Sequence, residues 1–558
     1  MNSILLSTYV HSPLGVAALL VGLLSSTAIG AQGGVYSSTP EYSYPDLGAT
    51  SGLGDLNGDG HDDFIIGQPS NNPGGVEGAG SVYLFSGKTG AVLFELHGTT
   101  ENAEFGRTVA GVGDVNGDGV PDFSVGAPGT DHNGHFRAGS AYLYSGATAS
   151  LLMEVNGDFE YSHFGFKVAG AGDVNNDGLS DWMMSGHIGS GRIDNVFVFA
   201  GGSGAILHQF TELPESGWFG SSISSAGDVD GDGHSDLLIG DAFTDQNGLT
   251  NAGTAYVFSG ASGVQLHQFE GTLASGYLSQ SAASAGDVDG DGFSDLILGA
   301  PYASNNKHPY AGVAYVYSGA TGALLYEFWG NRKEAHLGGS VAGIGDLNQD
   351  GFDDLLIGAP ATSAAPPNDL GAVYVLSGAT GRLTHHINGR VPNDHFGRNA
   401  VSAGDVNGDG YPDILFTGST GAYVHTFFPS MTSTISQLSA ANGGMFFFEI
   451  DFPVDAAFDE YKILMSLSGI GPTKHGIQVP LTYDPLVQQT YIGNYPFFFH
   501  ANMWGVLDSN GDALATALVP QHVLQPLVGR TIYCAAIANK PGDLPEFSTV
   551  AVQIEITL

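Results

Sequence analysis

A nine-residue acidic pattern that recurs seven times constrains the fold of this chain more than any other feature. The copy DVDGDGHSD, which starts at Asp228, has aspartates at its first, third, fifth and ninth positions and a glycine at its sixth. The seven copies start at Asp55, Asp114, Asp173, Asp228, Asp287, Asp346 and Asp405, so successive starts lie 59, 59, 55, 59, 59 and 59 residues apart. A fixed period of this size is typical of architectures built from stacked or circularly arranged supersecondary units.

Each repeat contains four segments with the pattern of strands. A segment of small residues, such as 108–113, precedes the acidic loop, and an apolar segment, such as 122–128, follows it. An alternating segment such as 139–146 comes next, and the repeat closes with a fourth segment, such as 323–330 in a later copy. Alternating Val, Tyr, Phe and Leu bounded by Gly-rich turns favour strands. Four strands in each of seven units predict an all-β fold, a seven-bladed β-propeller.

The seventh repeat lacks its own fourth strand, because the period ends at about Pro429. The segment Gly34–Pro45 occupies the position that a fourth strand has before every other acidic loop. We therefore predict that this N-terminal segment completes the seventh blade and closes the ring, which would remove the open sheet edges.

The spacing of the acidic residues predicts calcium sites. Side-chain oxygens at positions one, three, five and nine and the carbonyl at position seven can converge on one ion, and calcium takes six to eight such oxygen ligands. The glycine at position six permits the sharp turn. Without a cation, each close carboxylate pair would cost about 4 kcal/mol at an effective dielectric constant near 20. We therefore predict up to seven structural Ca²⁺ ions, one in each loop.

The predicted calcium ligands are Asp55, Asn57, Asp59, His61, Asp63, Asp114, Asn116, Asp118, Val120, Asp122, Asp173, Asn175, Asp177, Leu179, Asp181, Asp228, Asp230, Asp232, His234, Asp236, Asp287, Asp289, Asp291, Phe293, Asp295, Asp346, Asn348, Asp350, Phe352, Asp354, Asp405, Asn407, Asp409, Tyr411 and Asp413. A helix–loop–helix calcium site does not fit, because it needs a glutamate at position twelve, where this chain has apolar residues such as Ile66 and Ile239.

Two short motifs flank the acidic loops. Phe-Gly pairs precede four loops, at Phe105, Phe164, Phe219 and Phe396, and Gly-Ala-Pro follows three, at Gly126, Gly299 and Gly358. Together with the loops, these motifs closely resemble the FG-GAP repeat of the integrin α-subunit β-propeller, over about residues 34–429. The resemblance implies a calcium-stabilised interaction platform. Integrin-type propellers carry calcium in only some blades, whereas all seven loops here have suitable ligands.

The chain departs from this pattern in several blades. Leu278-Ser279 and Leu337-Gly338 replace two Phe-Gly pairs, and the segments 186–188, 240–242 and 418–420 replace Gly-Ala-Pro. We expect these replacements to change local packing rather than calcium binding.

The two ends of the chain lie outside the repeats. Residues 1–31 resemble a secretory signal, with an apolar stretch at Leu14–Leu24 and small residues before Ala31, although Lys and Arg are missing ahead of the apolar stretch. A membrane anchor is the alternative, but roughly eleven apolar residues are too few to span a bilayer. Residues 430–558 predict a separate all-β domain of sandwich type, similar to the C-terminal β-domains of large bacterial secreted proteins. The one cysteine, Cys534, cannot form an internal disulfide.

Charge limits the partners. The chain has 56 acidic residues against 15 Lys and Arg and a formal net charge of −41. This balance argues against nucleic acids and anionic membranes as partners, because no basic patch is available to replace their counterions. We also expect no membrane span once the signal is cleaved.

The most variable loops predict the partner surface. In an up-and-down blade the connections between strands two and three, and between blades, lie on the face opposite the acidic loops, and variable loops on a rigid scaffold usually carry binding sites. These connections hold Arg137, Arg192, Trp218, Tyr302, Lys307, Tyr310 and Arg332. We therefore expect an extracellular protein or glycan as ligand on this face.

The sequence thus predicts a secreted or cell-surface, calcium-binding interaction or adhesion module. We expect no catalytic residues, because no nucleophile elbow, zinc-binding helix or phosphate loop is present. Two alternatives stay open at this point. One is an extracellular enzyme of polysaccharide lyase or hydrolase type that uses the propeller as a scaffold, and the other is a purely structural surface component.

Overall fold

The computed structural model gives full detail for most of the repeat region and backbone strands elsewhere. It describes side chains over residues 48–188, 194–211, 217–348, 350–360, 370–389, 395–408, 410–418 and 421–426. The predicted signal, residues 1–31, lies outside the described residues. None of the helices in the described part of the chain has the length and apolarity needed to cross a membrane.

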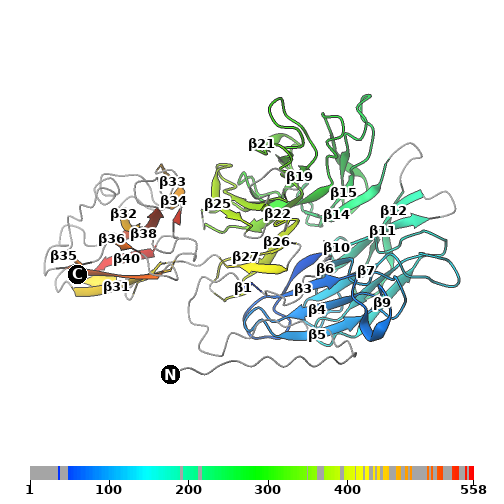
Figure 1. Cartoon of the computed structure of the whole chain (residues 1–558), viewed down its shortest axis with the longest axis horizontal. Coiled ribbons are helices and arrows are strands. Elements are labelled where there is room, and N and C mark those ends of the chain that lie inside the picture. The colour runs from blue at the N-terminus through cyan, green and yellow to red at the C-terminus, as the bar shows by residue number, and fades with distance from the viewer. Residues whose placement is uncertain are drawn as a thin grey trace, which may run out of the picture.

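Seven four-stranded antiparallel sheets follow one another along the chain and form the blades of a propeller, which confirms the predicted fold (Figure 1). We number each blade, and its acidic loop, in chain order. Blades one to three consist of β2 (Thr50–Gly54), β3 (Asp63–Gln68), β4 (Ser81–Phe85) and β5 (Val92–His97); β6 (Thr108–Gly113), β7 (Asp122–Ala127), β8 (Ser140–Tyr144) and β9 (Leu151–Asn156); and β10 (Lys167–Gly172), β11 (Asp181–Ile188), β12 (Ile193–Phe199) and β13 (Ile206–Thr211).

Blades four to seven continue the same order, and a short 3₁₀ helix, η1 (Pro73–Gly75), lies in blade one. Their strands are β14 (Phe219–Gly227), β15 (Asp236–Asp241), β16 (Thr254–Phe258) and β17 (Gln265–Glu270); β18 (Ser281–Gly286), β19 (Asp295–Ala300), β20 (Val313–Tyr317) and β21 (Leu324–Trp329); β22 (Ser340–Gly345), β23 (Asp354–Ala359), β24 (Ala372–Leu376) and β25 (Leu383–Asn388); and β26 (Asn399–Gly404), β27 (Asp413–Thr417) and β28 (Ala422–His425).

The N-terminal segment supplies the fourth strand of blade seven. Strand β1 (Tyr36–Ser37) pairs antiparallel with β28, with Tyr36 opposite Val424 and Ser37 opposite Tyr423. This pairing confirms the predicted ring closure between the two ends of the repeat region. The rest of the predicted segment Gly34–Pro45 lies outside the described residues.

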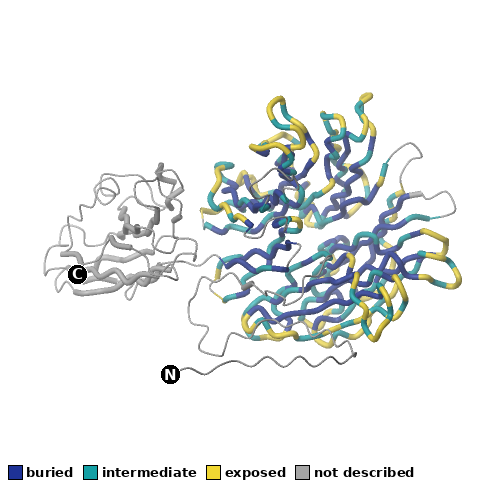
Figure 2. The backbone as a smooth tube through the Cα atoms, viewed as in Figure 1, coloured by how far each residue is buried: buried dark blue, intermediate teal, exposed yellow. Residues whose placement is uncertain are grey.

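The hydrophobic core lies between neighbouring blades. One cluster, for example, combines Leu238 and Val257 of blade four with Leu296 and Leu298 of blade five, and all four side chains are buried. The second strand of each blade is almost fully buried, whereas the fourth strand, as in β17, alternates exposed and partly buried residues at the outer edge. Figure 2 shows the same gradient, with buried strands inside and exposed loops outside.

Small residues let the seven first strands approach each other around the axis. Each first strand contacts its neighbours in the ring, and β2 contacts both β6 and β26. The residue three positions before each acidic loop is glycine or serine: Gly52, Gly111, Gly170, Ser225, Ser284, Gly343 and Ser402. A Cβ on Gly111 would lie 2.6 Å from the carbonyl oxygen of Gly52. A larger side chain at these positions would therefore push the blades apart.

The Phe-Gly and Gly-Ala-Pro motifs interlock neighbouring blades. Phe105 is 4% exposed, and Leu278, which replaces the phenylalanine in blade five, is 2% exposed and so fills the equivalent core position. Gly106 has a φ of +87°, and its carbonyl lies so close to Gly67 of the preceding blade that a Cβ on Gly67 would overlap it. Close backbone approach explains why both motifs contain glycine.

The strand register corrects two of the expected motif positions. Gly126 of Gly-Ala-Pro lies opposite Thr108, and the residues at the equivalent place in blades three and seven are Ser185 and Thr417. The replacements for Gly-Ala-Pro therefore begin at 185 and 417, one residue earlier than the segments 186–188 and 418–420 that we expected. The glycine of the motif is the fourth residue after the ninth-position aspartate in every blade that has it.

The elements that the structure describes in the C-terminal region are β-strands. Its backbone forms a four-stranded sheet, a larger sheet that includes one parallel pair, and a two-stranded ribbon. The strands are β29 (Met431–Ser433), β30 (Gln437–Ser439), β31 (Gly444–Asp451), β32 (Glu460–Ser466), β33 (Pro472–Lys474), β34 (Gln478–Pro480), β35 (Phe499–Ala501), β36 (Trp504–Val506), β37 (Asp512–Val519), β38 (Thr531–Asn539), β39 (Phe547–Ser548) and β40 (Val552–Thr557). The sandwich and the boundary at residue 430 stay predictions.

Candidate metal centre in the acidic loops

All seven acidic loops connect the first strand of a blade to its second strand. Since every blade has the same strand order, the loops lie on one face of the propeller, and since the first strands are innermost, they gather around the axis. The connections that hold Arg137, Trp218, Tyr302, Lys307, Tyr310 and Arg332 run between strands two and three or between blades, at the opposite ends of the strands. Arg192 lies outside the described residues.

The first aspartate of each loop holds the loop in a turn. In loop four, the Asp228 carboxylate accepts hydrogen bonds from the backbone N–H groups of Gly231 (2.7 Å), Asp232 (3.2 Å) and Gly233 (3.0 Å). The same pattern is present around Asp55, where partial burial raises the pKa but the backbone N–H groups outweigh it and hold the pKa below its ordinary value. This aspartate therefore has a folding role in addition to any metal.

The aspartates at the middle of the loop bond to the turn as well. Asp230 accepts a hydrogen bond from the N–H of Asp232 at 3.2 Å, and Asp232 accepts one from the N–H of His234 at 2.9 Å. Asn116 and Asp118 make the equivalent bonds in loop two. These bonds fix the positions of the side-chain oxygens that would face an ion.

The ninth aspartate is buried and bonded to two separate parts of its blade. Asp236 accepts hydrogen bonds from the N–H of Val229 in its own loop and from that of Gly260 in the turn between strands three and four, both at 2.9 Å. Desolvation raises the pKa of Asp236 to about 6 and that of Asp354 to about 8. Because the folded state then binds the proton of Asp236 more tightly, its ionisation costs stability as the pH rises from about 4 to about 6, and a cation would offset this cost.

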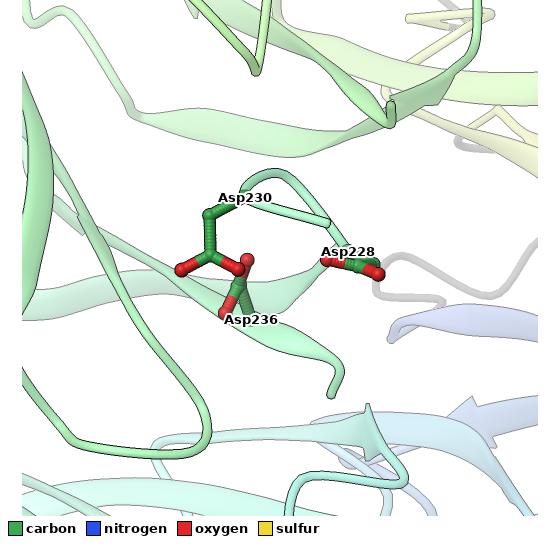
Figure 3. A group of neighbouring side chains, drawn as sticks. All are labelled: Asp228, Asp230 and Asp236. Carbon is green, nitrogen blue, oxygen red and sulfur yellow. The ribbon is translucent and has the colours of Figure 1, made fainter. Parts of the chain in front are cut away.

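The carboxylates come together most closely in loops four and five. One oxygen each from Asp228, Asp230 and Asp236 lie within 4.8 Å of one another, and Figure 3 shows Asp230 and Asp236 facing each other with Asp228 beside them. In loop five, the corresponding group consists of Asp287, Asp289 and Asp291. Such hard oxygen donors suit calcium. The other five loops have asparagine at position three, which offers a neutral oxygen instead of a carboxylate.

The remaining predicted ligands occupy equivalent places in their loops, and Asp409 lies outside the described residues. The side chains at position seven, whose carbonyls are the predicted ligands, lie against the preceding loop. A Cβ on Gly231 or Gly290 would lie 2.6 Å from the ring of Phe293 or Phe352, respectively. His61 similarly lies against Gly408 of loop seven. The position-seven side chains thus pack neighbouring loops together.

Backbone hydrogen bonds also join neighbouring loops, which the sequence analysis did not anticipate. The N–H at position eight donates to the position-one carbonyl of the preceding loop, as from Ser235 to Asp173 (2.9 Å) and from Ser294 to Asp228 (3.1 Å). The equivalent bonds run from Ser180, Asp353 and Asp62 to Asp114, Asp287 and Asp405. Pro121 and Pro412 occupy position eight in loops two and seven and have no N–H to donate. The loops are therefore linked as one group of five and one group of two.

Asp62 and Asp353 link neighbouring loops, a role that the search for ligand positions missed. Each stands at position eight, where the other loops have serine or proline, and each carboxylate accepts the N–H of the first aspartate of the preceding loop: Asp62 from Asp405 and Asp353 from Asp287, both at 2.8 Å. Asp62 thus joins blade one to blade seven at the seam of the ring. The consecutive aspartates at 62–63 and 353–354 were the available signal.

Comparison with known families identifies the repeat. Six segments match the FG-GAP repeat, at residues 47–85, 105–144, 219–258, 279–317, 338–376 and 397–429. Six of the seven blades are FG-GAP repeats. Blade three is not among the matched segments, and it has Ser185 in place of the motif glycine, yet it folds as the other blades of the FG-GAP propeller do.

Curated relatives of the FG-GAP propeller fall into two groups. Integrin alpha-5 of Xenopus laevis is 28% identical over 268 residues, which cover 44% of this chain and 25% of the relative, and integrin alpha-V of Gallus gallus is 29% identical over 215 residues, which cover 36% and 20%. Phosphatidylinositol-glycan-specific phospholipase D of Homo sapiens is 28% identical over 396 residues, which cover 60% and 46%. The matched part thus spans less than half the length of each of these relatives.

Proposed function

We propose that this protein is a secreted or cell-surface interaction module, a calcium-stabilised FG-GAP propeller that binds an extracellular protein or glycan on the face opposite its acidic loops. The observation that carries the proposal is the convergence of carboxylates in loops of one repeated geometry, with three oxygen donors already within 4.8 Å of one another in loops four and five. Similarity to integrin α subunits supports the interaction role.

Calcium at these loops would have a structural task. The first and ninth aspartates are already bonded to the backbone, so an ion would enter a loop whose turn is formed. The ion would neutralise carboxylates that burial makes costly to ionise, such as Asp236. Because affinity rises with the number of charged ligands, loops four and five, with aspartate at all four side-chain ligand positions, would fill first.

The opposite face is the better candidate for ligand binding, because its connections differ from blade to blade. The acidic loops keep one length and one bonding pattern, whereas the connections after strand two range from the short turn at Gly418–Gly421 to the hairpin around His132 and His135. Such variation on a rigid scaffold is where specificity is usually placed.

Measurement of bound metal tests the proposal directly. We expect the protein, dialysed against millimolar calcium and passed rapidly through a metal-free column, to retain several calcium ions by elemental analysis, and titration of the metal-free protein to show two sites that fill before the rest. Asp230→Asn and Asp289→Asn should remove this distinction, since they give loops four and five the ligand set of the others. A protein that retains no calcium or other alkaline-earth ion under saturating conditions would refute the calcium part of the proposal.

A further inference from the structure

A continuous row of aromatic rings crosses the face opposite the acidic loops. We define the aromatic row as Phe166, Trp218, Phe243, Tyr277, Tyr302 and His336, in the order in which each contacts the next. The centroids of successive rings are 5.6, 5.1, 5.1, 5.3 and 4.8 Å apart. The six residues come from the connections of blades three to six that lie on the face opposite the acidic loops. The row is therefore assembled from positions spread over 170 residues of chain.

Two rings of the row are exposed to solvent, and the other four are partly buried. Trp218 is 50% exposed and Tyr302 is 39% exposed, and Tyr310, which contacts His336 at the end of the row, is 46% exposed. Phe243 and Tyr277 are partly buried between these rings. Large aromatic side chains exposed together on one face are typical of binding surfaces rather than of ordinary surface.

The scaffold does not require aromatic residues at these places. Trp218 and Tyr277 precede the Phe-Gly position, where blade two has Glu104, and Phe243 and Tyr302 follow the Gly-Ala-Pro position, where blade two has Gly129. Since the repeat folds with glutamate and glycine at the same positions, the rings of blades four and five are not there to complete the core. Their backbone is nevertheless well held: the N–H of Trp218 donates to the buried carboxylate of Asp241 at 2.8 Å.

The shape of the row favours an extended ligand that lies on top of it. Successive rings stand mostly edge to face, with interplanar angles of 89°, 45°, 72°, 71° and 69°, and they touch, so no slot separates them into which a side chain could insert. A track one ring wide that crosses four blades matches a linear polymer better than the broad surface of a globular partner. Aromatic rings supply rigid apolar contact area on which the C–H face of a sugar ring can pack.

The charges around the row favour an uncharged ligand. Asp245 accepts the N–H of Asn251 at 2.8 Å, Glu334 pairs with Lys333 at 3.1 Å, and Asp241 is fully buried. These three acids are therefore engaged or covered. One cation lies at the start of the row, where Lys167 Nζ is 6.0 Å from the centroid of the Phe166 ring, but the net charge of −41 repels a polyanion. Neutral hydrogen-bonding groups are at hand, since the Asn251 amide lies 3.4 Å from the hydroxyl of Tyr277.

We propose that the aromatic row binds a neutral, extended polysaccharide whose sugar rings stack on the exposed aromatic faces. This inference rests on the proposed function, because it names the ligand class for the face that we assign to binding.

Affinity electrophoresis of the full chain in calcium tests this inference. The gels would contain a soluble neutral polysaccharide (mixed-linkage β-glucan, xylan or galactomannan), and separate gels would contain polygalacturonate as a polyanion. We expect at least one neutral polymer to retard the wild-type protein. Trp218→Ala and Tyr302→Ala should each weaken that binding roughly tenfold or more, the loss expected for an aromatic anchor.

Phe136→Ala is the matched control. Phe136 is 48% exposed on the same face and contacts Tyr161 outside the row, so its removal should change affinity by less than about twofold. If Trp218→Ala failed to fold, Tyr302→Ala would still test the inference. Blade six has Ala361 at the position equivalent to Tyr302, so we expect the repeat to tolerate alanine there. Melting curves in calcium would check that each variant is folded.

Three results would overturn the inference. The first is that no neutral polymer retards the wild type, and the second is that Phe136→Ala loses as much affinity as Trp218→Ala. The third is that the protein binds only polygalacturonate, or only a proline-rich peptide added to test for an extended protein ligand. Because calcium binding is read from bound metal, each of these failures would leave the calcium part of the proposed function standing.

Discussion

Removal of calcium should lower the melting temperature of the propeller by on the order of 10 °C. Extracellular calcium modules have dissociation constants of roughly 10⁻⁴–10⁻³ M, and at ten times the dissociation constant each site adds about 1.4 kcal/mol to the free energy of unfolding. Seven sites would then contribute on the order of 10 kcal/mol, which is comparable to the whole stability of a typical domain. The entropy of unfolding of a domain this large converts that loss into the stated shift.

Differential scanning calorimetry in 2 mM calcium and in excess EGTA would measure this shift. Magnesium added back after chelation serves as the control for ionic strength, since its smaller, octahedral site is a poor match for these loops. Identical melting curves with and without chelator would show that the acidic loops do not depend on an ion for stability.

Two substitutions in loop four should separate the folding role of an aspartate from its metal role. Asp236→Ala leaves the N–H groups of Val229 and Gly260 buried without their acceptor. Since an orphaned buried donor costs roughly 1–3 kcal/mol, we expect Asp236→Ala to reduce the free energy of unfolding by about 2–5 kcal/mol even in EGTA. Denaturant unfolding in EGTA would measure it.

Asp232→Ala is the matched comparison in the same loop. Asp232 lies at the exposed part of the turn and accepts a hydrogen bond from His234, so in EGTA its removal should change stability by no more than about 0.5 kcal/mol. In calcium it should cost about 1.4 kcal/mol, the contribution of one site. If Asp232→Ala and Asp236→Ala had equal effects in EGTA, the ninth aspartate would have no separate folding role.

The sequence was sufficient for the architecture because the determining signals are local and repeated. Alternating residues and Gly-rich turns mark each strand, and the 59-residue period sets the number of blades. The segment that closes blade seven was predictable for the same reason, since Tyr36 and Ser37 stand where the period requires a fourth strand. The register of Gly-Ala-Pro was less certain in blades three and seven, because Ser185 and Thr417 offer no glycine from which to count.

The contacts between residues far apart in the sequence could not be predicted from the same signals. Asp236 invites a metal interpretation, but one of its hydrogen-bond donors is Gly260, 24 residues later in another turn. The bond between Asp62 and Asp405 joins residues 343 positions apart. The aromatic row combines two sets of repeat positions: Trp218, Tyr277 and His336 lie 59 residues apart, and so do Phe243 and Tyr302. Only the folded ring shows that the two sets alternate in one row.

The bonds at the seam bear on how this molecule is made. Asp62 exchanges two backbone-anchored hydrogen bonds with Asp405, and His61 contacts the carbonyl of Val406, so blade one finds its neighbour only near the end of the repeat region. At a synthesis rate of roughly 5–20 residues per second, the first blade waits on the order of 20–70 s for that partner. Contacts this distant in sequence slow folding. A nascent propeller therefore has two uncovered apolar flanks for most of its synthesis, which makes it a natural client for chaperones until the circle is complete.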